Sequence, residues 1–198
     1  MADPRPSIAA RRRTFKQLHE GGCFVIPNPW DVGSARFLQG LGFKALATTS
    51  SGFAWSQGRP DNGISRDMAL AHLRDIVAAT DLPVNADFES GFAVDAAGVA
   101  ESVRLAVGTG VAGLSIEDST GDAARPLYEL SVAVERIRAA RAAIDQTGGD
   151  TLLVGRAECF FVGRPDLGEA IERLKAYAHA GADCLYAPGI RTREQITA

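Results

Sequence analysis

The sequence predicts an α/β fold and, within that class, a (β/α)8 TIM barrel of which this chain supplies about six of the eight units. Apolar, β-rich runs alternate with helical patterns, and polar residues gather where the runs end. The six predicted strands are Cys23–Pro27, Ala45–Thr49, Val84–Phe88, Gly113–Glu117, Leu152–Ala157 and Asp183–Ala187. Strands that alternate with helices indicate parallel strands joined by crossovers.

The stretches between these runs repeat apolar residues at helical spacing. One such set is Met68, Leu70, Leu73, Ile76 and Val77, and another is Val132, Val134, Ile137, Ala140 and Ile144. Side chains that cap helices predict helix starts at Ser65, Asp95, Ser131 and Asp166. Three similar segments, L-G-F-K-A, T-G-V-A-G and A-G-A-D-C, predict helix ends at Gly42, Gly110 and Gly181, where a left-handed residue is needed.

An open doubly wound sheet is the alternative to a barrel. Its phosphate-binding loop should follow the first strand, whereas G-T-G-V-A-G at Gly108–Gly113 lies at a helix end and enters a strand. The polar residues at the strand ends are Asn28, Asp31, Ser50, Ser51, Asp87, Glu89, Glu117, Asp118, Arg156 and Glu158. Polar residues at the carboxyl ends of the strands favour the barrel, because a barrel's site lies at that mouth.

The chain is short for this fold. A (β/α)8 barrel takes about 250 residues, whereas this sequence has 198. We expect one domain over residues 1–198 that is incomplete at its C-terminal end, since an open barrel would expose two strand edges. The alternative is another element covering the gap. Residues 1–13 are predicted to be a flexible lead.

The composition is that of a soluble globular protein. It is 46% hydrophobic and 23% charged, with a formal net charge of −3. This balance favours neither nucleic acid nor an anionic membrane as a partner, and an apolar run of about 18 residues is lacking. The three cysteines, Cys23, Cys159 and Cys184, have neither disulfide nor zinc spacing, which favours a reducing cytoplasm.

Carboxylates dominate the predicted barrel mouth. Asn85, Asp87 and Glu89 alternate along one strand and therefore share a face. Glu117 and Asp118 repeat the pattern at the next strand end. A single such aspartate would be interpreted as a helix cap or a turn residue. Several carboxylates at one mouth repel each other unless a cation or shared protons intervene, and oxygen ligands suit Mg²⁺.

Other segments supply candidate substrate contacts. Arg156, which ends the fifth predicted strand, is either a partner for these carboxylates or a clamp for an anionic substrate. Thr48–Ala54 has the hydroxyls and glycine of an anion-binding turn, and Gln57–Gly63 is a turn-rich loop able to fold over a site. The histidines fall in predicted outer helices: His19, His72 and His179.

Over about residues 14–190 the sequence resembles the isocitrate lyase/phosphoenolpyruvate mutase superfamily. The resemblance is carried, in order, by S-S-G-F-A-W-S-Q-G-R-P-D, V-N-A-D-F-E-S-G-F, G-L-S-I-E-D-S, R-P-L-Y-E-L and V-G-R-A-E-C-F. It implies a (β/α)8 barrel in which Mg²⁺ stabilises a pyruvate enolate while a C–C or P–C bond forms or breaks. Relatives assemble as tetramers, which implies a homo-oligomer.

The resemblance also implies a metal site. Asp87 matches the aspartate that touches the metal, and Glu117 matches a glutamate that acts largely through water and contributes to catalysis. Asn85 stands at the first acidic position of the family's D-x-D, a departure that Glu89 would compensate as a further metal ligand.

Substrate contacts and catalysis are carried over in the same way. Ser51, Gly52 and Phe53 resemble the segment that binds the substrate carboxylate, and Arg156 resembles the substrate-binding, catalytic arginine. Asp61 resembles the catalytic-site aspartate of the following loop.

Departures from the family narrow the reaction. The loop Asp118–Leu127 lacks the lyases' cysteine and the mutases' lysine and asparagine, and Tyr186 stands where relatives have glutamate or histidine. The resemblance therefore implies a Mg²⁺-dependent enzyme that cleaves a C–C bond of a small 2-oxo or 2-hydroxy carboxylate through a pyruvate-enolate-like intermediate. The alternatives are P–C bond chemistry and a non-catalytic carboxylate-binding barrel.

Overall fold

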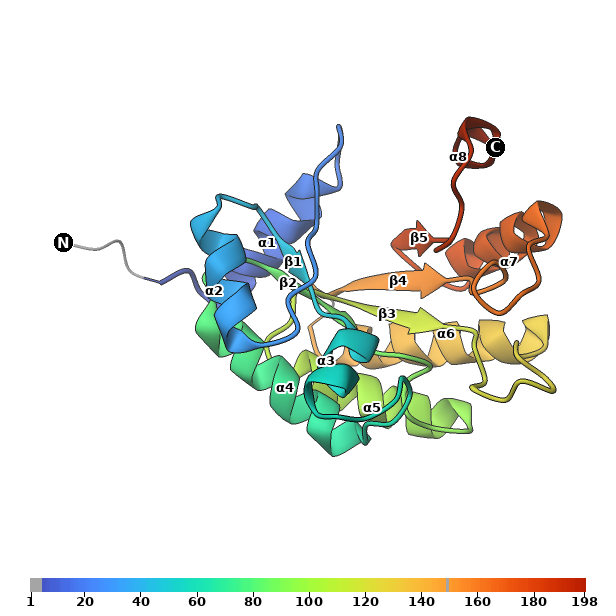
Figure 1. Cartoon of the computed structure of the whole chain (residues 1–198), viewed down its shortest axis with the longest axis horizontal. Coiled ribbons are helices and arrows are strands. Elements are labelled where there is room, and N and C mark those ends of the chain that lie inside the picture. The colour runs from blue at the N-terminus through green and yellow to red at the C-terminus, as the bar shows by residue number, and fades with distance from the viewer. Residues whose placement is uncertain (1–4, 149) are drawn as a thin grey trace.

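The computed structural model describes residues 5–148 and 150–198. Its centre is a parallel sheet whose strands follow each other in chain order and curl into part of a barrel (Figure 1). The strands are β1 (Leu46–Ala47), β2 (Val84–Asp87), β3 (Gly113–Glu117), β4 (Leu152–Arg156) and β5 (Cys184–Tyr186). The α/β half-barrel agrees with the predicted fold class, with five strands in place of six.

The outer face of the sheet is covered by some of the helices that precede, join and follow the strands. The helices are α1 (Ile8–Leu18), α2 (Val32–Gly40), α3 (Ser50–Ser56), α4 (Arg66–Ala79), α5 (Ala96–Val107), α6 (Leu130–Gln146), α7 (Leu167–His179) and α8 (Arg193–Thr197). Helices α4, α5 and α6 lie side by side along that face (Figure 1). The main hydrophobic core includes the buried side chains of Leu114, Ile116 and Leu153. Within the described residues, no helix is both long and apolar enough to span a membrane.

The first predicted strand, Cys23–Pro27, is wrong. This segment is extended but forms no ladder in the described part of the chain. The N–H of Ala47 donates to the Pro27 carbonyl at 3.1 Å. Proline has no N–H to offer in return, and Val25 is 66% exposed. The segment therefore lies against β1 without extending the sheet.

The predicted helix boundaries agree closely with the structure. Three predicted N-caps are confirmed, each accepting a hydrogen bond from the first turn: Ser65, Asp95 and Asp166. Ser131 was a wrong start, because the Glu129 carbonyl already accepts from the N–H of Ala133 at 2.9 Å. The three predicted glycine helix ends have φ angles of 84°, 91° and 105°: Gly42, Gly110 and Gly181.

The predicted flexible lead over residues 1–13 is wrong in its second half. Helix α1 begins at Ile8, and the Arg11 guanidinium donates to the Val77 carbonyl at 3.1 Å. That carbonyl belongs to the last turn of α4, where carbonyls lack partners within the helix and attract cations. Arg11, from the basic cluster, thus binds α1 to the C-terminal end of α4. Residues 1–4 lie outside the described residues.

Candidate active site

The carboxyl ends of the strands meet at one mouth. Because β2, β3 and β4 are in register, Asp87 lies opposite Ser115, and Glu117 lies opposite Arg156. A cavity of about 330 Å³ opens there. Its lining residues are Ser50, Ser51, Asp61, Asn62, Asp87, Glu117, Ser119, Arg156, Glu158, Phe161 and Val162. Five predicted site residues, Ser51, Asp61, Asp87, Glu117 and Arg156, are therefore brought together.

Arg156 is the centre of the charged part of this cavity. Its Nη1 lies 3.3 Å from Asp87 Oδ1, its Nε lies 3.5 Å from Glu117 Oε2, and Nε also donates to Glu158. Burial by itself lowers the pKa of Arg156, but the three carboxylates outweigh it and raise that pKa. One permanent cation thus faces three acidic groups, which leaves a negative surplus.

Two glutamates close to this surplus of negative charge have raised pKa values. Burial raises the pKa of Glu117 to about 8, with Arg156 opposing the shift and neighbouring carboxylates adding to it. Burial also raises the pKa of Glu89 to about 7, and the charges of Asp87 and Asp61 add to it. Both groups therefore hold protons near neutral pH unless another cation compensates them.

Asp87 is fixed by the start of α3. The N–H and the hydroxyl of Ser50 both donate to Asp87 Oδ2 at 2.9 Å. The Asp87 N–H in turn donates to Thr48 Oγ1 at 2.9 Å. Sequence reasoning placed Ser50 at a strand end, within the predicted anion-binding turn Thr48–Ala54, and not as a partner of Asp87. Its function of orienting Asp87 depends on the parallel pairing of β1 and β2, which no local motif reveals.

Of the three residues predicted to bind the substrate carboxylate, Ser51 is the one that lines the cavity. Gly52 and Phe53 do not line it, and their N–H groups donate to Thr49, at 3.1 Å to its hydroxyl and 3.0 Å to its carbonyl respectively. The Phe53 ring instead stacks on His72 with 3.9 Å between ring centroids.

The prediction that His72 lies on an outer face is wrong. Its side chain points inward beneath α3 and is 9% exposed, and burial lowers its pKa to about 4. Helix α4 buries Leu73 and Ile76, as its apolar pattern predicts. His72 lies beside them, so the buried face of α4 is wider than its apolar residues alone indicate. His19 and His179 are exposed, as expected.

The pairing of β2 with its neighbouring strands also changes the interpretation of Asn85. This residue pairs with Ala47 and Gly113, one layer below the mouth, and it does not line the cavity. Glu89 instead lies level with Glu117, whose N–H donates to the Glu89 carbonyl at 3.1 Å. Of the three alternating residues, Asp87 alone lines the cavity, and Glu89 is buried close to it.

The donor set fits Mg²⁺ held largely through water. Across residues 5–148 and 150–198, no three His, Cys, Asp or Glu side chains form a ready cage for a metal. Mg²⁺ needs no such cage, because it binds through one or two carboxylates and keeps several waters. Glu89 Oε1 is buried without a hydrogen-bond partner in the described structure, and Asp87 and Glu117 supply only oxygen.

Comparison with known proteins places this chain in a family. Residues 15–198 match the family model described as phosphoenolpyruvate phosphomutase. The chain belongs to this family. A crystal structure from Burkholderia cenocepacia J2315, provisionally described as a lyase/mutase, is 50% identical with a TM-score of 0.93, covering 96% of this chain and 69% of that one. The superfamily resemblance expected from the motifs is confirmed.

Other members of the family carry assigned reactions. The 2-methylisocitrate lyase of Escherichia coli K12 is 35% identical over 81% of this chain and 55% of its own length. A phosphonopyruvate hydrolase, crystallised with oxalate and Mg²⁺, is 25% identical with a TM-score of 0.86, covering 94% of this chain and 66% of that one. The chain spans about two thirds or less of the length of the curated relatives it matches. Lyases and hydrolases thus share this architecture.

Proposed function

We propose that the protein is a Mg²⁺-dependent lyase that cleaves a C–C bond of a small 2-oxo or 2-hydroxy carboxylate through a pyruvate-enolate-like intermediate. The observation that carries this proposal is the surplus of carboxylates around Arg156 in a cavity of about 330 Å³. Such a surplus suits a divalent cation together with an anionic substrate. A purely structural ion-pair network would be balanced.

The chain's own residues supply binding and orientation. Arg156 donates to the substrate carboxylate and to the oxygen on which negative charge develops, where a preorganised cation is most effective. Ser51 adds a hydroxyl to the same wall, and Ser50 keeps Asp87 in the orientation needed for the metal. Asp87 would hold Mg²⁺ directly, and Glu117 and Glu89 would hold it through water; the ion would supply positive charge that stabilises a developing enolate oxygen.

Proton transfer is assigned to carboxylates. The loop Asp118–Leu127 contains no cysteine, lysine, histidine or asparagine. Asp61 lines the cavity from the loop that follows α3. We assign Asp61 and Glu117 to moving or orienting protons. Burial raises the pKa of Glu117 to about 8, which suits a general acid near neutral pH.

A second candidate is P–C bond chemistry, favoured by the likeness to phosphonopyruvate hydrolase. Cleavage of phosphonopyruvate, like that of a 2-oxo acid such as oxaloacetate, leaves an enolate of pyruvate, so the same wall would serve either. A non-catalytic carboxylate-binding barrel is the third candidate, and the acid–base residues missing from the loop after Glu117 favour it.

Release of pyruvate tests these candidates. Oxaloacetate, methylisocitrate, dimethylmalate and phosphonopyruvate are each incubated with the protein, with Mg²⁺ or with a chelator. We expect Mg²⁺-dependent pyruvate from a C–C substrate and loss of that activity in Asp87→Asn. Turnover of phosphonopyruvate alone would favour the second candidate. Oxalate binding without turnover of any compound would contradict an enzymatic function.

We also propose a cytoplasmic homo-oligomer of single-domain chains. Exposed apolar side chains in the N-terminal part of the chain support self-association, with Val25 at 66% and Leu41 at 61% exposure. Cys23, Cys159 and Cys184 are all unpaired, which suits a reducing compartment. Light scattering should give a mass that is a multiple of 20.9 kDa, and a monomer at micromolar concentration would contradict it.

A further inference from the structure

A second cavity of about 320 Å³ opens beside the candidate active site. The two cavities share Ser119, Phe161 and Val162. The remaining lining of the second one is Gly121, Asp122, Ala123 and Pro126, all from the loop that follows β3. The shared residues form the passage between the charged wall around Arg156 and a more apolar space. A ligand longer than the charged cavity would extend through this passage.

Phe161 is the unusual member of this passage. The Phe161 side chain is 66% exposed, although a phenyl ring beside a charged cavity gains free energy when it is covered. Its position is fixed, because the N–H groups of Phe161 and Val162 donate to the Glu158 carbonyl at 2.9 and 3.1 Å. Val162 packs on the small cluster of Leu127 and Cys159. The turn after β4 therefore presents an apolar wall directly next to Glu158, which accepts a hydrogen bond from Arg156.

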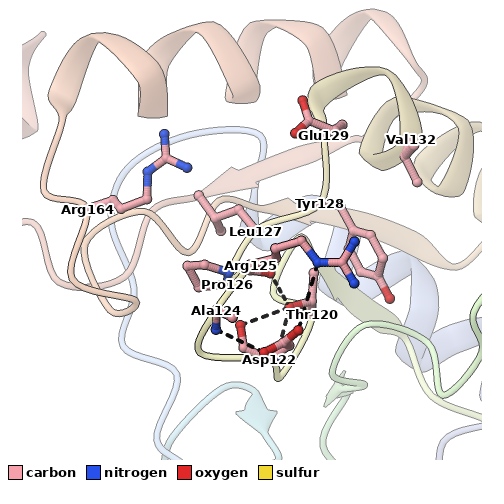
Figure 2. A pocket seen from close by; sticks show the side chains of 10 residues that line it. All are labelled: Thr120, Asp122, Ala124, Arg125, Pro126, Leu127, Tyr128, Glu129, Val132 and Arg164. Atoms are coloured by element: carbon pink, nitrogen blue, oxygen red, sulfur yellow. Dashed lines mark hydrogen bonds and ion pairs between the residues drawn. The ribbon is translucent and has the colours of Figure 1, made fainter.

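The opposite wall is also preformed. Figure 2 shows the loop folded on itself by hydrogen bonds between its own residues. Thr120 Oγ1 donates to the Arg125 carbonyl at 2.5 Å and accepts from the N–H of Asp122 at 3.0 Å. Asp122 Oδ1 accepts from the N–H of Ala124 at 2.9 Å. These bonds hold the loop segment that carries Ala123 and Pro126 without help from a ligand.

We propose that Phe161, Val162, Ala123 and Pro126 form a subsite for an apolar substituent of the substrate. The substrate class is then a 2-oxo or 2-hydroxy carboxylate that carries an alkyl branch or tail, with its carboxylate at Arg156. This assignment of the head group rests on the proposed function. The polar cavity binds the acid, and the neighbouring cavity selects its substituent.

Binding of substituted malonates tests the subsite without any turnover. Calorimetry in the presence of Mg²⁺ compares malonate with its methyl, ethyl and propyl derivatives. Each added methylene should tighten binding about fourfold, as expected for a buried CH₂ group. In Phe161→Ala the gradient should fall below about twofold per methylene, and Phe161→Leu should restore most of it. Phe37→Ala is the matched control, because Phe37 is 67% exposed and lines neither cavity.

Several outcomes would overturn the subsite. Equal binding of all four malonates by the unaltered protein would do so, as would a gradient that survives in Phe161→Ala or disappears in Phe37→Ala. Failure of every malonate to bind would count against it as well. The pyruvate assay fails independently: no turnover with an intact alkyl gradient refutes the lyase and keeps the subsite, whereas turnover without a gradient does the reverse.

Discussion

Two neighbouring carboxylates at the end of β3 have opposite surroundings. Glu117 faces the cavity and shares Arg156 with Asp87 and Glu158. Asp118, the next residue, points away from the cavity toward α7 and is 2% exposed. Side chains on either side of a strand end differ in this way because successive residues face opposite directions.

The Asp118 side is fully compensated. Asp118 Oδ2 accepts from the Tyr177 hydroxyl at 2.5 Å and from Arg173 Nη1 at 3.2 Å. Asp118 Oδ1 accepts from the N–H of Glu158 at 2.8 Å. Arg173 also pairs with Glu169, to which Arg164 supplies a second cation, so two cations face two carboxylates. Each acidic oxygen has donors, as buried polar groups in a stable structure should.

The contrast separates function from stability. On the cavity side carboxylates outnumber cations, and burial holds the pKa of Glu117 at about 8. On the α7 side every charge is matched. A buried surplus destabilises a fold, so its position at a cavity indicates that a ligand compensates it. The Asp118 group instead holds β4 in place through the backbone of Glu158.

Removing the shared cation should have the largest effect. Arg156→Met leaves the carboxylates around the cavity without their partner and removes the substrate clamp. We expect activity to fall by about 1000-fold or more and stability at pH 8 to fall by about 3 kcal/mol. Pyruvate release and urea unfolding measure the two effects. Arg164→Gln, which breaks an exposed pair with Glu169, should change stability by less than about 1 kcal/mol.

Asp118→Asn tests the carboxylate that faces α7. It removes one of the two carboxylate partners of the buried Arg173 guanidinium and the charged acceptor of the Tyr177 hydroxyl, which should destabilise the protein by about 3 kcal/mol. In the folded fraction, KM should stay nearly unchanged, because Asp118 does not line the cavity. Thermal unfolding and kinetics at low temperature separate these effects. A large rise in KM with unchanged stability would show that the two sides are not distinct.

The support of α3 by His72 should depend on pH. Its pKa is about 4 in the folded protein, against about 6.5 unfolded. The neutral ring therefore stabilises the fold fully above pH 6.5, and this contribution, up to about 3 kcal/mol, is lost as the pH falls toward 4. His72→Gln should flatten the unfolding free energy over this range. His179→Gln, at an exposed position, should leave the slope unchanged.

Glu117→Gln should have the smallest effect on stability, and in the opposite direction. The pKa of Glu117 is raised, so its ionisation opposes folding as the pH rises from about 4.5 to about 8. Without Mg²⁺, the variant should be more stable than the unaltered protein at pH 8 by roughly 2 kcal/mol. The added stability conferred by millimolar Mg²⁺ should shrink. A metal response equal to that of the unaltered protein would remove Glu117 from the metal site.

The sequence by itself determined the α/β class, the strand ends and the identity of the acidic residues. These features depend on local patterns: apolar runs, capping side chains such as Ser65, and glycines such as Gly42. The motif around Asp87 also predicts a metal site, which stays a prediction. Periodicity places residues on faces of one element, and this is enough for such predictions.

Tertiary structure alone decided which of these residues meet. Asn85 shares a strand face with Asp87, but the register with β3 places Glu89 level with Glu117. The sequence predicts that His72 lies on an outer face, but in the structure Phe53 of α3 covers its ring. The different surroundings of Glu117 and Asp118 also arise from strands and helices distant in sequence. Hydrogen bonding between strands sets depth in the barrel and packing sets burial, and neither is encoded by any single segment.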